Sequence, residues 1–147
     1  MTGELLKQIL DKVREQEDLQ PHDGITYCNI ATDRILGLCG IPRMVNKLNG
    51  KPLMANDMID FMANSPSRFI KVNGVGAYLR ANGGALVFAC QKGDVHGHLC
   101  PIYPIDMGFS PSWGKDVPFC SNVGKVNKVL RASQCFHDEP VYYSVIL

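Results

Sequence analysis

The sequence has little net charge, and charge of neither sign is clustered. Its 15 Lys and Arg residues are nearly balanced by 14 Asp and Glu residues, which gives a formal net charge of +1. Binding to nucleic acid or to an anionic membrane surface depends mainly on clustered positive charge, and no basic run is present. The charge pattern therefore argues against a nucleic-acid-binding protein.

Long apolar runs and targeting signals are also missing. The longest uninterrupted apolar stretches, such as 85–90, are far shorter than the roughly 20 residues needed to cross a bilayer. Segment 1–20 has neither the continuous apolar region nor the small-residue cleavage site of a secretory signal. We expect no membrane insertion, and a protein that stays in the cytoplasm unless another route exports it.

No internal repeat, low-complexity tract or Gly/Ser/Pro linker divides the 147 residues, and 46% of them are hydrophobic. This length and composition predict a single globular domain over residues 1–147. Six cysteines are many for such a chain, but none form a C-x-x-C pair and their spacings are irregular. Reduced thiols are therefore the expectation.

Apolar spacing predicts helices in the first part of the chain. Segment 1–20 is amphipathic, and a second helix is expected to begin near Cys28 and to end at one of the glycines at positions 37 and 40. Asn56 is a suitable N-cap for a third helix, which Pro66 would end. The apolar face of the first helix comprises Leu5, Leu6, Ile9, Leu10 and Val13.

From position 82 onward the pattern changes to strands. The runs ALVFAC and HGHLCPIYP flank a short polar turn and predict a hairpin. Segment 104–116 contains so many Pro and Gly residues that we expect a long functional loop, whereas 117–122 and 141–146 are strand candidates and 126–136 is ambiguous. Helices followed by an antiparallel sheet indicate an α+β fold.

Cys28 is placed at the expected start of a helix. The unpaired backbone N–H groups and the positive end of the helix dipole there stabilise a thiolate, so Cys28 is a candidate nucleophile with a lowered pKa. The alternative is a small buried side chain, since cysteine is among the most buried residue types. His98, at the start of the second hairpin strand, is a plausible base for this thiol, whereas His22, His96 and His137 have no comparable context.

This order of features resembles the NlpC-type and CHAP-type papain-like cysteine hydrolases. It consists of a cysteine heading a helix, a G-x-L-V-F strand, a polar turn, and a strand that begins G-H and continues with apolar residues to an aromatic one, over about residues 26–123. Members of this superfamily cut amide bonds in peptidoglycan stem peptides. The resemblance implies a papain-like α+β domain in which N-terminal helices pack on a small antiparallel sheet. It implies a peptide or peptidoglycan fragment as substrate, and no cofactor.

The resemblance also implies roles for individual residues. Cys28 would be the nucleophile and His98 the base, and a polar residue within 118–124, for which we choose Asn122, would orient the imidazole. Asn122 has the alternative of an ordinary strand-end residue. The sequence departs from the family where Asn29 and Ile30 replace the usual Ser-Gly after the cysteine. It departs again where Pro101 interrupts the histidine strand, which indicates an edge strand or a bulge.

Two aromatic residues are candidates for substrate binding. Trp113, the only tryptophan, lies in the expected loop between His98 and Asn122, where it could form a wall of the cleft or anchor the loop on the sheet. Tyr27 precedes the nucleophile and could help to hold an oxyanion, although a packed aromatic is the more ordinary role.

Two other functions stay open. His96, His98 and Cys100 alternate along one expected strand and would share a face, so two of them could bind zinc together with Cys90 or Cys120. The second alternative is a catalytically inactive interaction domain on the same fold.

Overall fold

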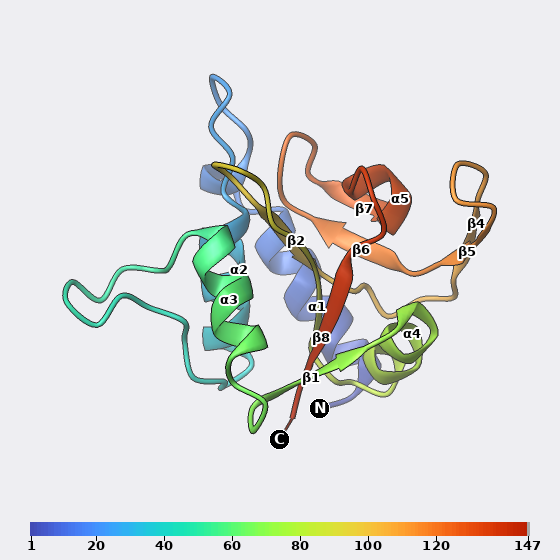
Figure 1. Ribbon diagram of the computed structural model, residues 1–147, viewed down its shortest axis with the longest axis horizontal. Helices are drawn as coiled ribbons and strands as arrows, with labels where there is room; N and C mark the ends of the chain where they lie inside the picture. Colours follow the sequence, from blue (N-terminus) through green and yellow to red (C-terminus); the bar gives the residue numbers. More distant parts are fainter. Residues whose placement is uncertain (147) are drawn as a thin grey trace.

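A computed structural model describes residues 1–146 and shows an α+β fold, as the sequence predicts (Figure 1). The helices are α1 (Gly3–Arg14), α2 (Cys28–Leu38), α3 (Ala55–Ala63), α4 (Gly74–Asn82) and α5 (Ala132–Cys135), with a 3-10 turn at Glu17–Leu19. The strands are β1 (Phe69–Val72), β2 (Val87–Gln91), β3 (His98–Pro101), β4 (Gly108–Ser110), β5 (Lys115–Val117), β6 (Phe119–Asn122), β7 (Lys128–Arg131) and β8 (Val141–Val145). Within the described residues, no helix is both long and apolar enough to cross a membrane.

The main sheet is antiparallel and has the strand order β1-β8-β2-β3. β3 is therefore an edge strand, which agrees with the presence of Pro101 at its end. Past that end the chain meets β6 of the separate β6–β7 hairpin, through a bridge between Ile102 and Cys120 and a 2.7 Å hydrogen bond from the Tyr103 amide to the Phe119 carbonyl. The two ends that carry His98 and Asn122 are thereby brought to the same region.

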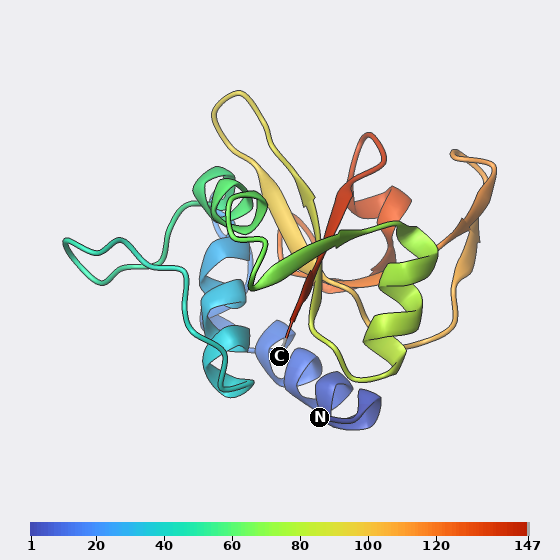
Figure 2. The same cartoon turned by 60° about the horizontal axis from the view of Figure 1, so that its bottom comes forward.

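Side chains alternate along the sheet and build two apolar clusters. Phe88 and Leu99 belong to the cluster formed with α1, α2 and α3, whereas Ala89 and Cys100 point to the opposite face, where α4 and α5 pack. Figure 2 shows α2 and α3 on one side of the central strands and α4 with β4–β5 on the other. The face toward which a β3 residue points therefore decides which set of elements it contacts.

The first helix is shorter and its buried face narrower than the sequence predicts. Leu6, Leu10 and Val13 are buried, but Leu5 is 47% exposed, and the helix ends at Arg14. The Arg14 guanidinium lies 2.7 Å from the Asp11 carboxylate and donates a 2.9 Å hydrogen bond to Ser121 Oγ of β6. α1 is thus tied to the strand that carries Asn122.

The third helix begins two residues earlier than predicted, at Ala55, with Met54 in the N-cap position. Asn56 is not the cap. Its side chain instead donates to the Gly93 carbonyl (2.9 Å) and accepts from the Gly93 amide (3.1 Å), which clamps the β2–β3 turn to α3. This turn leads directly into His98.

Three further expectations about secondary structure are corrected. Segment 104–116 is not an irregular loop, because β4 and the start of β5 pair within it as a hairpin whose turn contains Gly114 at φ 68°. Segment 117–122 is divided by Pro118 between β5 and β6. The sequence prediction also missed β1 and α4, although Asn73 caps α4 by accepting a 2.8 Å hydrogen bond from the Gly76 amide.

Candidate active site

Cys28 is the first residue of α2, as predicted, and its thiol faces backbone N–H groups. The Tyr27 side chain makes no capping hydrogen bond, so the first amides of the helix are left to other acceptors. The amides of Cys28 and Asn29 face the sulfur, and so does that of Leu99 on β3. The thiol therefore lies against the peptide group that follows His98.

The expectation of a lowered pKa at Cys28 is wrong. The residue is only 8% exposed, and this burial raises the pKa of the thiol above its ordinary value, although the three N–H groups oppose the shift. Desolvation disfavours the thiolate more than the helix start favours it. At neutral pH the resting side chain is a neutral thiol.

His98 is the first residue of β3 and is paired with Asn122, the last residue of β6. His98 Nε2 lies 2.7 Å from Asn122 Oδ1, and Asn122 Nδ2 donates a 2.7 Å hydrogen bond to the Val126 carbonyl. Because Nδ2 is engaged in this way, Oδ1 must be the atom that faces the ring, and Nε2 is the donor. In the neutral imidazole, Nδ1 is then unprotonated and can act as a base.

The imidazole of His98 is closely packed. A Cβ added at Gly124 would lie 3.2 Å from His98 Cε1, and the Phe136 ring centroid is 5.2 Å from that of His98. The other orienting candidates lie elsewhere: Ser121 accepts from Arg14 on the opposite face of β6, and Asp116 is exposed on β5. Asn122 is thus the polar group of this segment that contacts His98.

Two cavities meet at the start of β3. Cys28 lines a cavity of about 80 Å³, and His98 and Asn122 line a larger one of about 450 Å³. Thr26, His96 and Gly97 line both cavities. The two cavities therefore adjoin, but among the described residues no hydrogen bond joins Cys28 to His98, whose ring is paired with Asn122 instead.

The two predicted substrate-binding aromatics lie away from this depression. Trp113 is in the β4–β5 turn, packs on the cluster around α4 and α5, and lines a different cavity beside Phe136 and His137. It is a loop anchor and not a wall of the cleft that Cys28 faces. Tyr27 packs against the cluster under α1–α3 and lines neither cavity, so it has the role of a packed aromatic.

The proposed alternation of metal ligands along one strand is also corrected. His96 is exposed in the turn before β3, so it is not part of the strand face that holds His98 and Cys100. Cys100 instead meets Cys120 of β6 and Cys135 of α5. The pKa of Cys135 is lowered, mainly because the thiols of Cys100 and Cys120 donate toward its sulfur.

Lys125 is a further candidate that the sequence did not single out. It is exposed at the rim of the larger cavity, which His96 and His98 also line. Among the described residues, no Asp or Glu lines either cavity. The cavity lining therefore carries the exposed cation Lys125 and no carboxylate, but it also includes Cys135, whose lowered pKa favours a thiolate.

Comparison of the chain with protein-family models and with curated proteins gives no match. The activity has to be inferred from the site itself.

Proposed function

We propose that the protein is a cysteine-dependent amide hydrolase of papain-like type that cuts acidic peptides such as peptidoglycan stem peptides. The observation that carries this proposal is the 2.7 Å contact between His98 Nε2 and Asn122 Oδ1. It leaves Nδ1 as the free base of an imidazole whose cavity shares Thr26, His96 and Gly97 with the cavity that Cys28 lines. A thiol, a base and a residue that orients the base are the three parts that nucleophilic acyl transfer needs.

The chemistry begins from a neutral thiol. His98 Nδ1 takes the Cys28 proton as Sγ bonds to the amide carbonyl carbon, and the carbonyl π electrons move to oxygen. Collapse of this intermediate breaks the C–N bond, and the imidazolium returns the proton to the leaving amine. Water, deprotonated by His98, then attacks the thioester and releases the acid and the Cys28 thiol.

The oxyanion of each tetrahedral intermediate needs hydrogen-bond donors that are already in position. The amides of Cys28 and Asn29 face the nucleophilic sulfur, and they belong to the helix turn whose N–H groups lack intrahelical partners. Asn29 is itself held in place, because its side-chain amide donates a 3.1 Å hydrogen bond to the Leu53 carbonyl. Backbone donors fixed in this way stabilise charge without reorganising during the reaction.

The choice of substrate rests on the cavity beside His98. Its volume of about 450 Å³ is within the usual range for small-ligand sites and suits a short peptide. Its charged and titratable lining groups are Lys125, His96, His98 and Cys135, with no carboxylate among the described residues. In this proposal Lys125 at the rim pairs with a free carboxylate near the scissile bond, such as stem peptides carry.

The test is to incubate the protein with purified peptidoglycan and to separate the released fragments by liquid chromatography and mass spectrometry. We expect new amine and carboxylate ends from the wild-type protein and none from Cys28→Ala. Cys39→Ala is the matched control, because Cys39 lies at the opposite end of α2 and lines neither cavity. It should keep wild-type turnover.

The two neighbouring histidines give a second test of the assignment. His98→Ala should abolish cleavage, whereas His96→Ala should retain most of it, because His96 is exposed and makes no contact with Asn122. Equal turnover by wild type and Cys28→Ala would refute the proposal. The opposite result for the two histidines would move the base to His96.

A further inference from the structure

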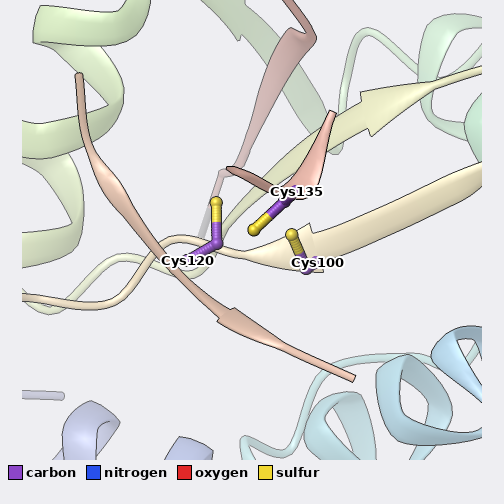
Figure 3. A group of neighbouring side chains, drawn as sticks. All are labelled: Cys100, Cys120 and Cys135. Atoms are coloured by element: carbon purple, nitrogen blue, oxygen red, sulfur yellow. The ribbon is translucent and has the colours of Figure 1, made fainter. Parts of the chain in front are cut away.

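Three thiols from three separate elements converge behind the predicted base. Cys100 comes from β3, Cys120 from β6 and Cys135 from α5, and their Sγ atoms all lie within 4.8 Å of one another. Figure 3 shows the three side chains pointing into a common space. Cys100 is 1% exposed and Cys120 is fully buried, whereas Cys135 is half-buried and lines the larger cavity.

We propose that Cys100, Cys120 and Cys135 form a zinc site with three thiolate ligands and a fourth position filled by water or another small ligand from the cavity. Zinc is bound tetrahedrally by thiolates, and three protein ligands with an exchangeable fourth are an established arrangement for it. Binding releases to solvent the protons that the thiols still carry, those of Cys100 and Cys120, and the Zn²⁺ charge offsets most of the charge of the three thiolates. A disulfide, in contrast, would use only two of the three thiols.

The neighbouring histidine is not one of the ligands. His98 Nε2 is engaged by Asn122, and the ring nitrogens are not among the donor atoms that lie mutually within 4.8 Å. The site nevertheless bears on the predicted active site, because Cys100 is two residues after His98 and Cys120 is two residues before Asn122. A metal that joins β3 to β6 would fix the relative position of the base and its orienting residue.

The experiment uses the reduced full-length protein and ZnCl₂ in competition with a chromophoric chelator. We expect one zinc per chain. Cys135→Ser should weaken binding by about a hundredfold or more, since even the loss of an outer-shell partner costs up to about that factor. Cys39→Ser, which removes a half-buried thiol outside the cluster, should bind zinc as the wild type does.

X-ray absorption at the zinc edge provides a measurement that needs no variant and so does not depend on the folding of a cysteine mutant. The loaded wild-type protein should show three sulfur neighbours at about 2.3 Å and one lighter atom. A sulfur count of one or none, zinc affinity unchanged in Cys135→Ser, or binding of Cu(I) but not of Zn²⁺ would overturn the proposal. So would a disulfide among these cysteines under the reducing conditions used. None of these readouts involves substrate, so they are independent of the proposed hydrolase activity.

Discussion

In the proposed mechanism, replacing Asn122 by Ala removes the side-chain acceptor that keeps the His98 proton on Nε2. The 2.7 Å bond from Nε2 to Oδ1 is short, and its loss lets the imidazole rotate or carry its proton on Nδ1, where it cannot act as a base toward Cys28. We expect kcat to fall by roughly ten- to a hundredfold, or about 1.4 to 2.7 kcal/mol of barrier. Cys28→Ala should remove activity altogether.

Because the Cys28 thiol is neutral at rest, we expect the fall in kcat of Asn122→Ala to be nearer a hundredfold than tenfold. If a thiolate and an imidazolium were already paired, the orienting residue would stabilise no new charge during attack. Because burial raises the pKa of Cys28 and keeps it neutral, the imidazolium forms only as the sulfur attacks. Asn122 Oδ1 then accepts a hydrogen bond from a newly charged ring, and such bonds are stronger than neutral ones.

Two variants separate this role from a structural one. Asn122→Asp keeps an acceptor for Nε2 and should retain more activity than Asn122→Ala, although it loses the bond to the Val126 carbonyl. Asn127→Ala is the control, because Asn127 braces the same turn through the Gly124 amide and the Leu19 carbonyl but has no bond to His98. Its melting temperature should fall with little change in kcat.

The assay is steady-state cleavage of a soluble stem-peptide fragment, with kcat and KM measured separately and the melting temperature recorded for each variant. A positioning role predicts a lower kcat at nearly constant KM for Asn122→Ala. An unchanged kcat together with an unchanged melting temperature would refute the reasoning, since it would mean that His98 is oriented by another group.

Three further predictions concern packing, thiol reactivity and pH. Gly124→Ala should lower kcat by about tenfold, because the added Cβ would lie 3.2 Å from His98 Cε1. Gly37→Ala is the control and should leave kcat unchanged, because a Cβ there meets nothing within 4 Å. Equal effects of the two substitutions on kcat would contradict the packing argument. In metal-free protein at pH 6, iodoacetamide followed by peptide mapping should label half-buried Cys135 before buried Cys28, and the reverse order would contradict the stated pKa directions. Burial, together with the nearby Cys28, raises the pKa of Cys90 in the folded protein. Above the unfolded pKa near 9.0 the unfolded chain loses the Cys90 proton while the folded protein keeps it, so the free energy of unfolding falls as pH rises. In urea titrations under reductant, the slope of the free energy of unfolding against pH above 9.0 should be shallower for Cys90→Ala than for the wild type, by about 1.4 kcal/mol per pH unit. Parallel pH dependences of the two proteins would exclude this contribution.

Short-range patterns were enough to predict the parts of the site that lie at the ends of regular elements. The helix that begins at Cys28 and the hairpin that places His98 at the start of β3 are both present as predicted. Asn122 lies at the end of its strand, and that position was chosen from the resemblance. Helix periodicity and strand-turn-strand patterns are local properties, so one sequence reveals them.

The sequence could not reveal contacts that depend on which distant elements meet. Cys135 lay in a segment of ambiguous pattern, and nothing local indicated that α5 would bring it to Cys100 and Cys120. Trp113 was assigned to the cleft because it lies between His98 and Asn122 in the chain, but the β4–β5 hairpin carries it to another cavity. In both cases strand pairing at long range decided the outcome.

The error about the Cys28 pKa has a different origin, which lies in the balance of two physical effects. The helix start and the amides that face the sulfur are present and lower the pKa, as expected, but a thiol that is 8% exposed also loses its hydration. Sequence position reveals the first effect and not the second, because burial depends on Leu99 and the rest of β3 packing over the end of α2. In the proposed mechanism, a Cys28 thiol that is neutral at rest must therefore be deprotonated by His98.

The alternation of side chains along β3 limits which residue of that strand could serve Cys28 as the base that the proposed mechanism needs. Leu99 points to the face covered by α1–α3, where Cys28 lies, whereas His98 and Cys100 point to the opposite face. A histidine farther along the strand would be separated from the thiol by the sheet itself, as Cys100 is. At the strand's first residue the sheet ends, and the proposed mechanism requires Nδ1 of the imidazole that Asn122 holds to reach Cys28 around this edge. The two hydrogen bonds between Asn56 and Gly93 tie the turn that leads into this edge to α3, so a change at Asn56 would alter the position from which His98 has to reach Cys28.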